Sequence, residues 1–337
     1  MKDIEKICIC GGGSLGLVCA GFFLSKGIEV NLLTDHPSDW EQEISVIDLE
    51  GRKYGGLLNK ISSSPQAVIS DSDLVLLTVP GFLIKKKLLE IKPFLNHQSI
   101  IGSIVSSTGF FFEAHEVLGK EFTLFGFQRV PFIARTREYG KIGDLLGYKP
   151  CIYVAIENCD TPEKLRIQIE RLFSTKVNRL NSYFEASLTN SNPILHTGRL
   201  YILWKDYTEK GYKTCPKFYA DWDDKSSECI IKMDEEFQKL LKKLGIKAGS
   251  IPTLLNYYES TDAKSLTKKI QSIPAFKSIP APMKKIQDEW HPDFQSRYFT
   301  EDFPFGLHFI YKLCKVNNIS SPTINKIYEW GIKKLER

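Results

Sequence analysis

The 337-residue chain lacks the features that would assign it to a membrane, secreted or disulfide-rich class. No apolar run reaches the roughly 18 residues that a membrane-spanning helix needs. The first residues mix both charges and lead into a strand pattern, which differs from the layout of a signal peptide. The eight cysteines are scattered and include no Cys-x-x-Cys pair. We therefore expect reduced core thiols, no metal site, no membrane contact and a cytoplasmic location.

A compact basic block is also missing. The formal net charge is +5, but the lysines of the second half are interspersed with acids and do not cluster with arginines or aromatic residues. This distribution disfavours a nucleic-acid surface and suits the attraction of small anionic substrates. The length permits two domains with separate cores.

The chain opens with a complete βαβ pattern. Residues 4–10 predict a buried strand, residues 17–26 a helix that stops at Gly27, and residues 28–34 a second strand. This arrangement is the context in which a glycine-rich turn binds a dinucleotide.

The turn between the first strand and the helix matches G-x-G-x-x-G. Gly11 permits the tight turn, Gly13 lets backbone N–H groups approach a pyrophosphate, and Gly16 lets helix and strand pack closely. We therefore predict a dinucleotide cofactor. The intervening Ser14 and Leu15 are included in the site.

The ends of the next strands complete the predicted cofactor site. The second strand ends at Thr34-Asp35, where an acid usually binds the ribose hydroxyls and an arginine would accommodate a 2′-phosphate. No arginine is near, so we expect NAD or NADP, with NAD favoured. Another buried strand, residues 73–79, closes at Val79-Pro80, and open α/β sheets bind ligands at such carboxyl edges.

The remaining first half predicts further strands and one structural excursion. Residues 43–62 resemble a hairpin outside the parallel sheet, and residues 128–147 form a glycine-rich turn region. Gln128, at the start of that region, is taken as a substrate-binding candidate. A last helix and strand end the domain near residue 183.

The second half is predicted to be helical, with no recurring βαβ pattern. Helices are expected at residues 187–207, 226–244, 302–316 and 322–335, with a proline-rich loop at residues 272–281. The predicted fold is therefore an α/β Rossmann-type dinucleotide-binding domain, residues 1–183, followed by an all-α substrate domain, residues 184–337.

Two groups of polar residues stand out in the helical half. Asn192 and His196 are four residues apart, so a helix places them on one face. A lone histidine is more often structural than catalytic. About 100 residues later, Arg297 can bind a carboxylate through two bonds, and Thr300 or Asp302 can cap the helix that follows.

Together these residues resemble the NAD/NADP-dependent octopine (opine) dehydrogenase family over nearly the whole chain. The resemblance rests on four motifs: Gly11-x-Gly13-x-x-Gly16, Thr78-Val79-Pro80, Asn192-Pro193-x-x-His196 and Arg297-Tyr298-x-Thr300-Glu301-Asp302. It implies an oxidoreductase that combines an amino acid with a 2-oxo acid and reduces the resulting imine. It also implies that His196 and Asp302 form a catalytic dyad and that Asn192 and Arg297 hold the substrate.

Two alternatives remain open. A 2-oxo acid reductase similar to the ketopantoate reductases would share the two-domain plan, but those enzymes use a lysine early in the second domain, and no lysine occurs between Lys176 and Lys205. A non-catalytic NAD(H) sensor would have no need of a proton relay such as His196 with Asp302. The substrates and the oligomeric state stay open, with a homodimer as the candidate assembly.

Overall fold

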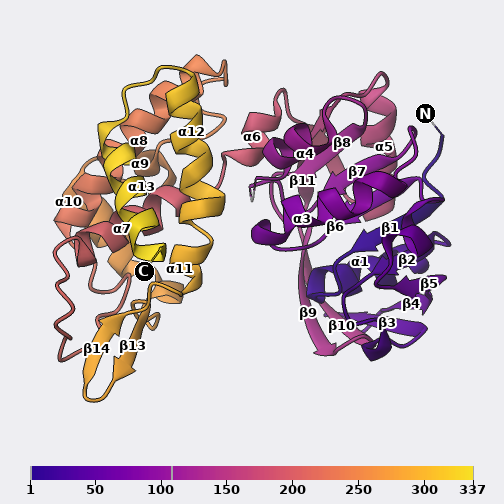
Figure 1. The fold of residues 1–337 in the computed structure, drawn as a ribbon, viewed down its shortest axis with the longest axis horizontal. Coiled ribbons are helices and arrows are strands. Elements are labelled where there is room, and N and C mark those ends of the chain that lie inside the picture. The colour runs from indigo at the N-terminus through magenta and orange to yellow at the C-terminus, as the bar shows by residue number, and fades with distance from the viewer. Residues whose placement is uncertain (1, 108, 337) are drawn as a thin grey trace. The chain divides into compact units, whose positions relative to one another are not determined.

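The computed structural model describes residues 2–107 and 109–336 and divides into two compact units, residues 1–187 and 188–337 (Figure 1). Helix α6 (Tyr183–Ser187) groups with the first unit, whereas the sequence-based boundary after residue 183 assigns it to the second domain. Within the described residues, no helix has the length and apolarity required to cross a membrane.

Strand β1 (Lys6–Cys10) lies inside an eight-stranded sheet, between β2 (Glu29–Leu33) and β6 (Leu74–Leu77). The strand order is β12-β11-β8-β7-β6-β1-β2-β5, and every pairing between described residues is parallel except β11 with β8. The chain order reverses beside β1, which is where open α/β sheets bind their ligands. The predicted Rossmann-type fold is therefore confirmed. The other strands are β5 (Lys60–Ser62), β7 (Ile100–Ser103), β8 (Thr123–Phe127), β11 (Cys151–Glu157) and β12 (Lys176–Arg179).

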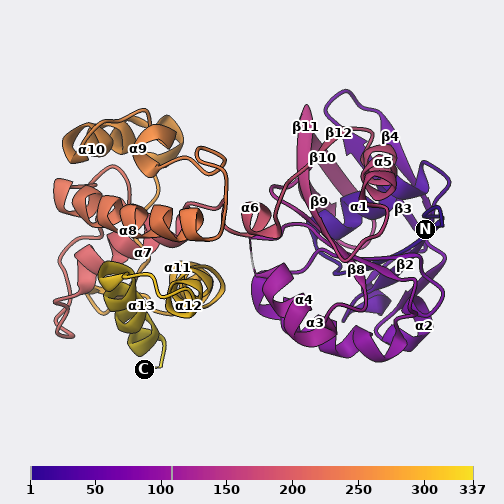
Figure 2. The ribbon, with the colours of Figure 1, turned by 90° about the horizontal axis from the view of Figure 1, so that it is seen from above.

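Both faces of this sheet are covered, as its central strand shows. Ile7 and Ile9 of β1 belong to one apolar core, and the alternate residues Cys8 and Cys10 belong to another. Successive side chains of a strand point to opposite faces, so a strand buried on both sides reads as a continuous apolar run. The helices of the two faces lie on opposite sides of the sheet (Figure 2). They are α1 (Ser14–Leu24) and α5 (Pro162–Phe173) on one side, and α2 (Pro65–Ile69), α3 (Gly81–Ile91) and α4 (Phe110–Leu118) on the other.

A second sheet packs against α1, in the order β4-β3-β10-β9. The predicted hairpin is present as β3 (Glu43–Asp48) and β4 (Lys53–Leu57), which pair antiparallel. The glycine-rich region predicted as turns instead contains β9 (Phe132–Glu138) and β10 (Ile142–Tyr148). The glycines between these strands and within β10 resemble turn residues, so the alternation of buried and exposed residues at the start of β9 was not recognised.

The second unit is built mainly from helices, as predicted. It also contains a two-stranded hairpin, β13 (Met283–Ile286) with β14 (Glu289–Pro292), which the sequence analysis did not predict. Four exposed or half-buried residues make up β13, so the strand carries no strong apolar pattern. The helices are α7 (Asn192–Trp204), α8 (Asp224–Lys243), α9 (Leu254–Tyr257), α10 (Ala263–Ser272), α11 (Arg297–Thr300), α12 (His308–Val316) and α13 (Pro322–Leu335).

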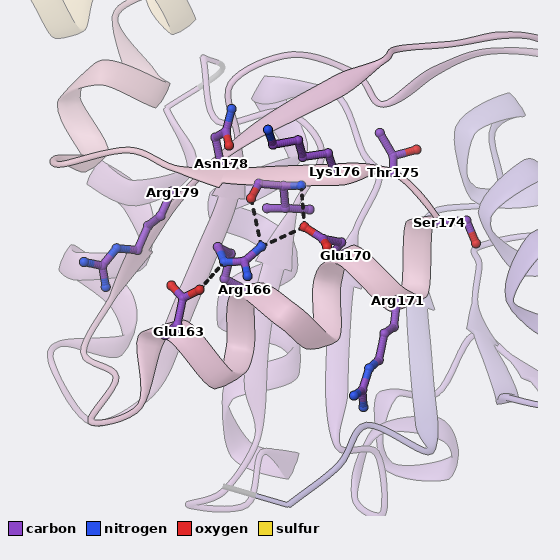
Figure 3. Close-up of a pocket in the computed structure, with 10 residues that line it drawn as sticks. Glu163, Arg166, Glu170, Arg171, Ser174, Thr175, Lys176, Asn178 and Arg179 are labelled. Carbon is purple, nitrogen blue, oxygen red and sulfur yellow. Dashed lines mark hydrogen bonds and ion pairs between the residues drawn. The ribbon is translucent and has the colours of Figure 1, made fainter.

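The edge of the large sheet at β12 is closed by side chains of α5 (Figure 3). The Val177 N–H donates to Glu170 Oε2 at 2.9 Å, and the Val177 carbonyl accepts from Arg166 Nη1 at 3.0 Å. Arg166 and Glu170 are also joined to each other, at 2.7 Å. The backbone groups that Val177 would offer to another chain at this edge are thus already bonded, in the wall of a cavity of about 770 Å³.

We predict that the double substitution Arg166→Ala with Glu170→Ala promotes intermolecular strand pairing, because it releases the outward N–H and carbonyl of Val177. Light scattering during slow heating should show aggregation at a lower temperature and a stronger dependence on protein concentration. Glu163→Ala is the matched control, since it removes a carboxylate paired with Arg166 and leaves both Val177 bonds in place. An aggregation temperature equal to that of the wild-type protein would contradict the prediction.

Candidate functional site

The turn after β1 requires glycine at two positions. Gly11 has φ of +121°, a conformation that side chains disfavour, and its carbonyl accepts a hydrogen bond from Thr78 Oγ1 at 3.1 Å. A Cβ added to Gly16 would lie 1.9 Å from the Gly11 carbonyl oxygen. Close packing of α1 over the turn therefore depends on both residues, as the sequence motif predicts.

Gly13 serves a different purpose at the N-terminus of α1. It is the residue before the helix and supplies no capping side chain, and a Cβ built there meets no atom within 4 Å. The first N–H groups of a helix have no partners within the helix, and they attract anions. Because the space over Gly13 is open, the turn fits the pyrophosphate of a dinucleotide.

A cavity of about 250 Å³ lies beside this turn, between the ends of β1, β2 and β6. Ser14, Leu15 and Gly16 are not among its described lining residues, and the Ser14 hydroxyl is instead 2.8 Å from Thr136 Oγ1. The larger cavity beside β12 contains none of the predicted cofactor residues. Six predicted cofactor residues line the small cavity: Gly11, Gly13, Thr34, Asp35, Val79 and Pro80.

Lys87 of α3 also lines this cavity and was not predicted. Its ammonium contacts Asp35 Oδ1 at 2.8 Å and Glu90 Oε2 at 2.9 Å, while its side chain is only 8% exposed. The hydrogen bond from Lys87 lowers the pKa of Asp35. Burial acts to lower the pKa of Lys87, but the bonds to Asp35 and Glu90 raise it above its ordinary value. Both groups are therefore charged at neutral pH.

In the second unit, helix α7 carries His196 on its buried face. Pro193 occupies the first turn of the helix, where its missing N–H costs no internal hydrogen bond. His196 is buried, and its ring packs against those of Tyr298 and Phe218 at 4.8 and 5.7 Å between centroids. Burial between aromatic rings fixes the direction of the imidazole.

Asp302 contacts His196 across 106 residues of sequence. Its Oδ2 lies 2.7 Å from His196 Nδ1, inside the 2.6 to 3.2 Å that a proton-transferring pair requires. The expectation that Asp302 or Thr300 caps the following helix was wrong for Asp302, whose side chain makes no capping bond. The Thr300 hydroxyl donates to the carbonyl of Ser296, the residue that precedes α11. The carboxylate of Asp302 is thereby left for the imidazole.

A π-helical turn, Phe303–Leu307, sets the position of Asp302. The Leu307 N–H donates to the Asp302 carbonyl at 2.7 Å, five residues back, in place of the usual four. A Cβ added to Gly306 would lie 2.7 Å from Pro193 Cγ. This glycine therefore lets the turn rest directly on α7, one helical turn before His196.

Tyr219 contacts the other ring nitrogen of His196, Nε2. Its hydroxyl lies 2.8 Å from His196 Nε2, and only 5% of the residue is exposed. Burial raises the pKa of Tyr219 well above its usual value, so the phenol stays protonated at neutral pH. The sequence offers no periodic pattern around Tyr219, which lies in a loop, and only the tertiary structure reveals it.

The loop that carries Tyr219 is held by Arg199, which lies three residues after His196 in α7. The guanidinium of Arg199 is 1% exposed and donates to the Asp223 carboxylate at 2.9 Å and to Ser226 Oγ at 2.8 Å. It also donates to the Phe218 carbonyl at 3.4 Å. A buried charge requires such partners, so the loop is fixed to α7 beside the histidine.

The predicted substrate residues are not gathered into one place by any contact seen among the described residues. Arg297 makes a two-bond ion pair with Glu301, at 2.7 and 2.9 Å, and its side chain is 83% exposed. Asn192 is half-buried at the start of α7, where its N–H donates to Asn190 Oδ1. Gln128 belongs to the first unit and lies 3.4 Å from the Glu185 carbonyl.

The geometry around His196 defines what the site can do chemically. A carboxylate only accepts hydrogen bonds, so Asp302 keeps a proton on Nδ1, and any proton that the imidazole gains or loses is at Nε2. Among the described residues, no group of three acidic, histidine or cysteine side chains is arranged to hold a metal ion. The arrangement suits general acid–base chemistry.

Family models match parts of both units. Residues 179–335 match the family model of the NAD/NADP octopine/nopaline dehydrogenase alpha-helical domain, and residues 7–131 match that of ketopantoate reductase PanE/ApbA. The chain is 25% identical to a tauropine dehydrogenase of Arabella iricolor, over 96% of this chain and 90% of the relative. It is 24% identical to an octopine dehydrogenase of Mizuhopecten yessoensis, over 98% and 90%.

Solved structures agree with these relatives in fold. An octopine dehydrogenase with NADH and L-arginine superimposes with a TM-score of 0.83 at 23% identity, covering 98% of this chain and 89% of that one. A ketopantoate reductase of Ralstonia eutropha also superimposes over 98% of this chain, with a lower TM-score of 0.64 at 14% identity. The ketopantoate reductase family model matches residues 7–131, whereas the helical part that holds His196 and Asp302 matches the octopine/nopaline model. The helical half of the chain therefore carries the octopine/nopaline dehydrogenase alpha-helical domain, and nearly the whole chain is similar to octopine and tauropine dehydrogenases.

Proposed function

We propose that the chain catalyses the NAD(P)H-dependent reductive condensation of an amino acid with a 2-oxo acid. The observation that carries the proposal is the 2.7 Å contact between His196 and Asp302 within the part that matches the octopine/nopaline domain. In this reaction the carbonyl and the amine form an imine with loss of water, and reduction of the imine requires one hydride and one proton. The reduced nicotinamide supplies the hydride.

We assign the proton to His196. Asp302 holds the Nδ1–H tautomer and stabilises the imidazolium, so Nε2 can give up a proton as the imine carbon is reduced. Asp302 is therefore a positioning residue for the histidine as well as its electrostatic partner. Burial of both side chains, which are 10% and 17% exposed, limits competition from water.

Substrate binding is assigned to Asn192, Arg297 and Gln128. Arg297 has the planar fork that binds a carboxylate through two bonds, and its bond to Glu301 is exposed and therefore weak enough to be exchanged for a substrate carboxylate. Under this proposal the first domain, residues 1–183, binds the cofactor and the second, residues 184–337, supplies the proton and the substrate contacts.

We also propose that NAD(H) is preferred over NADP(H). Lys87 and Asp35 line the cofactor cavity, and the Lys87 ammonium is bonded to Asp35 and to Glu90, which lies one helical turn along α3. Lys87 bonds to Asp35 Oδ1, which leaves Oδ2 to accept from a ribose hydroxyl. A 2′-phosphate at this position would meet the charge of Asp35.

The sensor and ketopantoate reductase alternatives are less well supported. A sensor has no use for a buried histidine between a carboxylate and a phenol, and the ketopantoate reductase model matches only the nucleotide-binding part. Oxidation of NADH by a panel of 2-oxo acids, each tested alone and with each amino acid, separates the three functions. A requirement for both substrates supports the proposal, turnover of a 2-oxo acid alone supports the reductase, and no turnover supports the sensor.

We predict that His196→Ala lowers kcat by about 100- to 10,000-fold, the usual contribution of a general acid, while the Kd for NADH changes little. Asp302→Asn should lower kcat by a smaller factor, because the amide oxygen can still accept from Nδ1 but the charge is lost. Initial rates of NADH oxidation and fluorescence titration of NADH measure the two quantities. His291→Ala is the control, since His291 also contacts a tyrosine, Tyr207, in the same unit. Turnover retained by His196→Ala would contradict the assignment.

For the cofactor preference, we predict that Asp35→Ala weakens NADH binding and strengthens NADPH binding, each by about 10- to 100-fold, because it removes a charged hydrogen-bond acceptor and frees Lys87 for a phosphate. Adding Lys87→Met to Asp35→Ala should abolish the gain for NADPH. Calorimetric Kd values for both cofactors test this without any turnover. Lys86→Met is the matched control, since Lys86 is the adjacent lysine of α3, lies 3.7 Å from Glu90 and makes no hydrogen bond to Asp35 among the described contacts. An unchanged cofactor ratio in Asp35→Ala would contradict the preference.

A further inference from the structure

Both ring nitrogens of His196 already have partners inside the second unit. Nδ1 contacts Asp302 at 2.7 Å and Nε2 contacts the Tyr219 hydroxyl at 2.8 Å. Because Asp302 keeps the proton on Nδ1, a proton that leaves the imidazole leaves from Nε2. Its nearest acceptor is the oxygen of Tyr219.

Tyr219 is packed too tightly to swing aside for a substrate atom. Its ring stacks on Phe276, 4.2 Å away at 21°, and on Trp222, 6.2 Å away at 6°, and meets Phe218 edge-on at 4.8 Å. Displacing a buried aromatic ring from such contacts gives up its hydrophobic and ring–ring stabilisation.

Arg199 holds the same loop through its backbone and side chains. It donates to the carbonyls of Phe218 and Asp221, on either side of Tyr219, and to the carboxylate of Asp223. A movement of Tyr219 would strain these bonds of a buried charge, which are costly to leave unmade. The hydroxyl is therefore a fixed neighbour of Nε2.

We propose that Tyr219 is a further catalytic residue, whose hydroxyl carries the proton between His196 Nε2 and the nitrogen of the imine substrate. This inference rests on the proposed function. The imine nitrogen takes the Tyr219 hydroxyl proton as hydride adds to the imine carbon, and the Tyr219 oxygen takes the Nε2 proton. The C=N double bond becomes a single bond, the imidazolium becomes neutral imidazole, and Tyr219 ends as the same neutral phenol.

The neutral phenol suits this role. Burial raises the pKa of Tyr219, so a free phenolate is disfavoured and its two proton transfers are coupled. A residue of this kind passes a proton on without storing charge. Tyr298, whose ring lies 4.8 Å from that of His196, packs on the same histidine, and its hydroxyl is hydrogen-bonded to that of Tyr219. The bond to Nε2 comes from Tyr219.

Tyr219→Phe tests the relay, because it removes one oxygen and keeps the ring that packs on Phe276 and Trp222. We expect both kcat and the single-turnover rate constant of NADH oxidation to fall about 100-fold or more, with the NADH Kd unchanged. The solvent deuterium isotope effect should change from that of two coupled protons to that of one. The ¹⁵N resonance of His196 Nε2 should also shift in the free enzyme, because the nitrogen loses its hydrogen-bond partner.

Tyr328→Phe is the matched control, since the Tyr328 hydroxyl lies 2.7 Å from His308 Nδ1 in the same unit, and it should leave kcat and the isotope effect unchanged. A kcat of Tyr219→Phe within about threefold of wild type, or an unchanged isotope effect, would overturn the relay. If the wild-type chain turns over no substrate pair, the proposed function fails and the relay fails with it. If the wild type turns over but the Nε2 resonance is unshifted in Tyr219→Phe, the relay alone is overturned, because the contact on which it depends is absent.

Discussion

A buried guanidinium organises the helical unit around its histidine. Arg199 lies on α7 next to His196 and is almost wholly removed from solvent, so its charge must be met by protein groups. The partners come from the loop that contains Tyr219 and from the start of α8. Removing one partner of a buried charge costs about 3–5 kcal/mol, which makes the position of this loop a condition of folding. The donor to Nε2 is thereby placed by the same interaction that stabilises the unit.

Local patterns were sufficient to predict the nucleotide-binding half. Gly11 and Gly13 lie in the turn after β1, and Gly16 lies in the first turn of α1. These three residues are close in both sequence and space, so the strand, turn and helix could be recognised together. The strands β9 and β10 were missed because the glycines between them and within β10 resemble turn residues, although buried and exposed residues alternate at the start of β9. These two strands belong to the sheet that packs against α1, and this tertiary contact is not visible in the local sequence.

The proton-transfer site could be predicted only in part. His196 and Asp302 were linked through the resemblance to a family, because 106 intervening residues separate them and no spacing rule connects them. Tyr219 and Lys87 were missed for the same physical reason. Each meets its partner through folding of a distant segment, and each lies in a stretch where its residue type is unremarkable. By contrast, Arg297 stood out in the sequence, yet its nearest partner is Glu301, four residues along.

The π-helical turn after Asp302 has a consequence for how this segment can change in length. It adds one residue to a helical turn, and an α-helix rotates by about 100° per residue. Losing a residue between Phe303 and Leu307 would therefore turn the carboxylate away from α7 or rotate α12 off its buried face. Residues can therefore be inserted or lost in the exposed turn of the β13–β14 hairpin, but not in the π-helical turn that rests on Pro193.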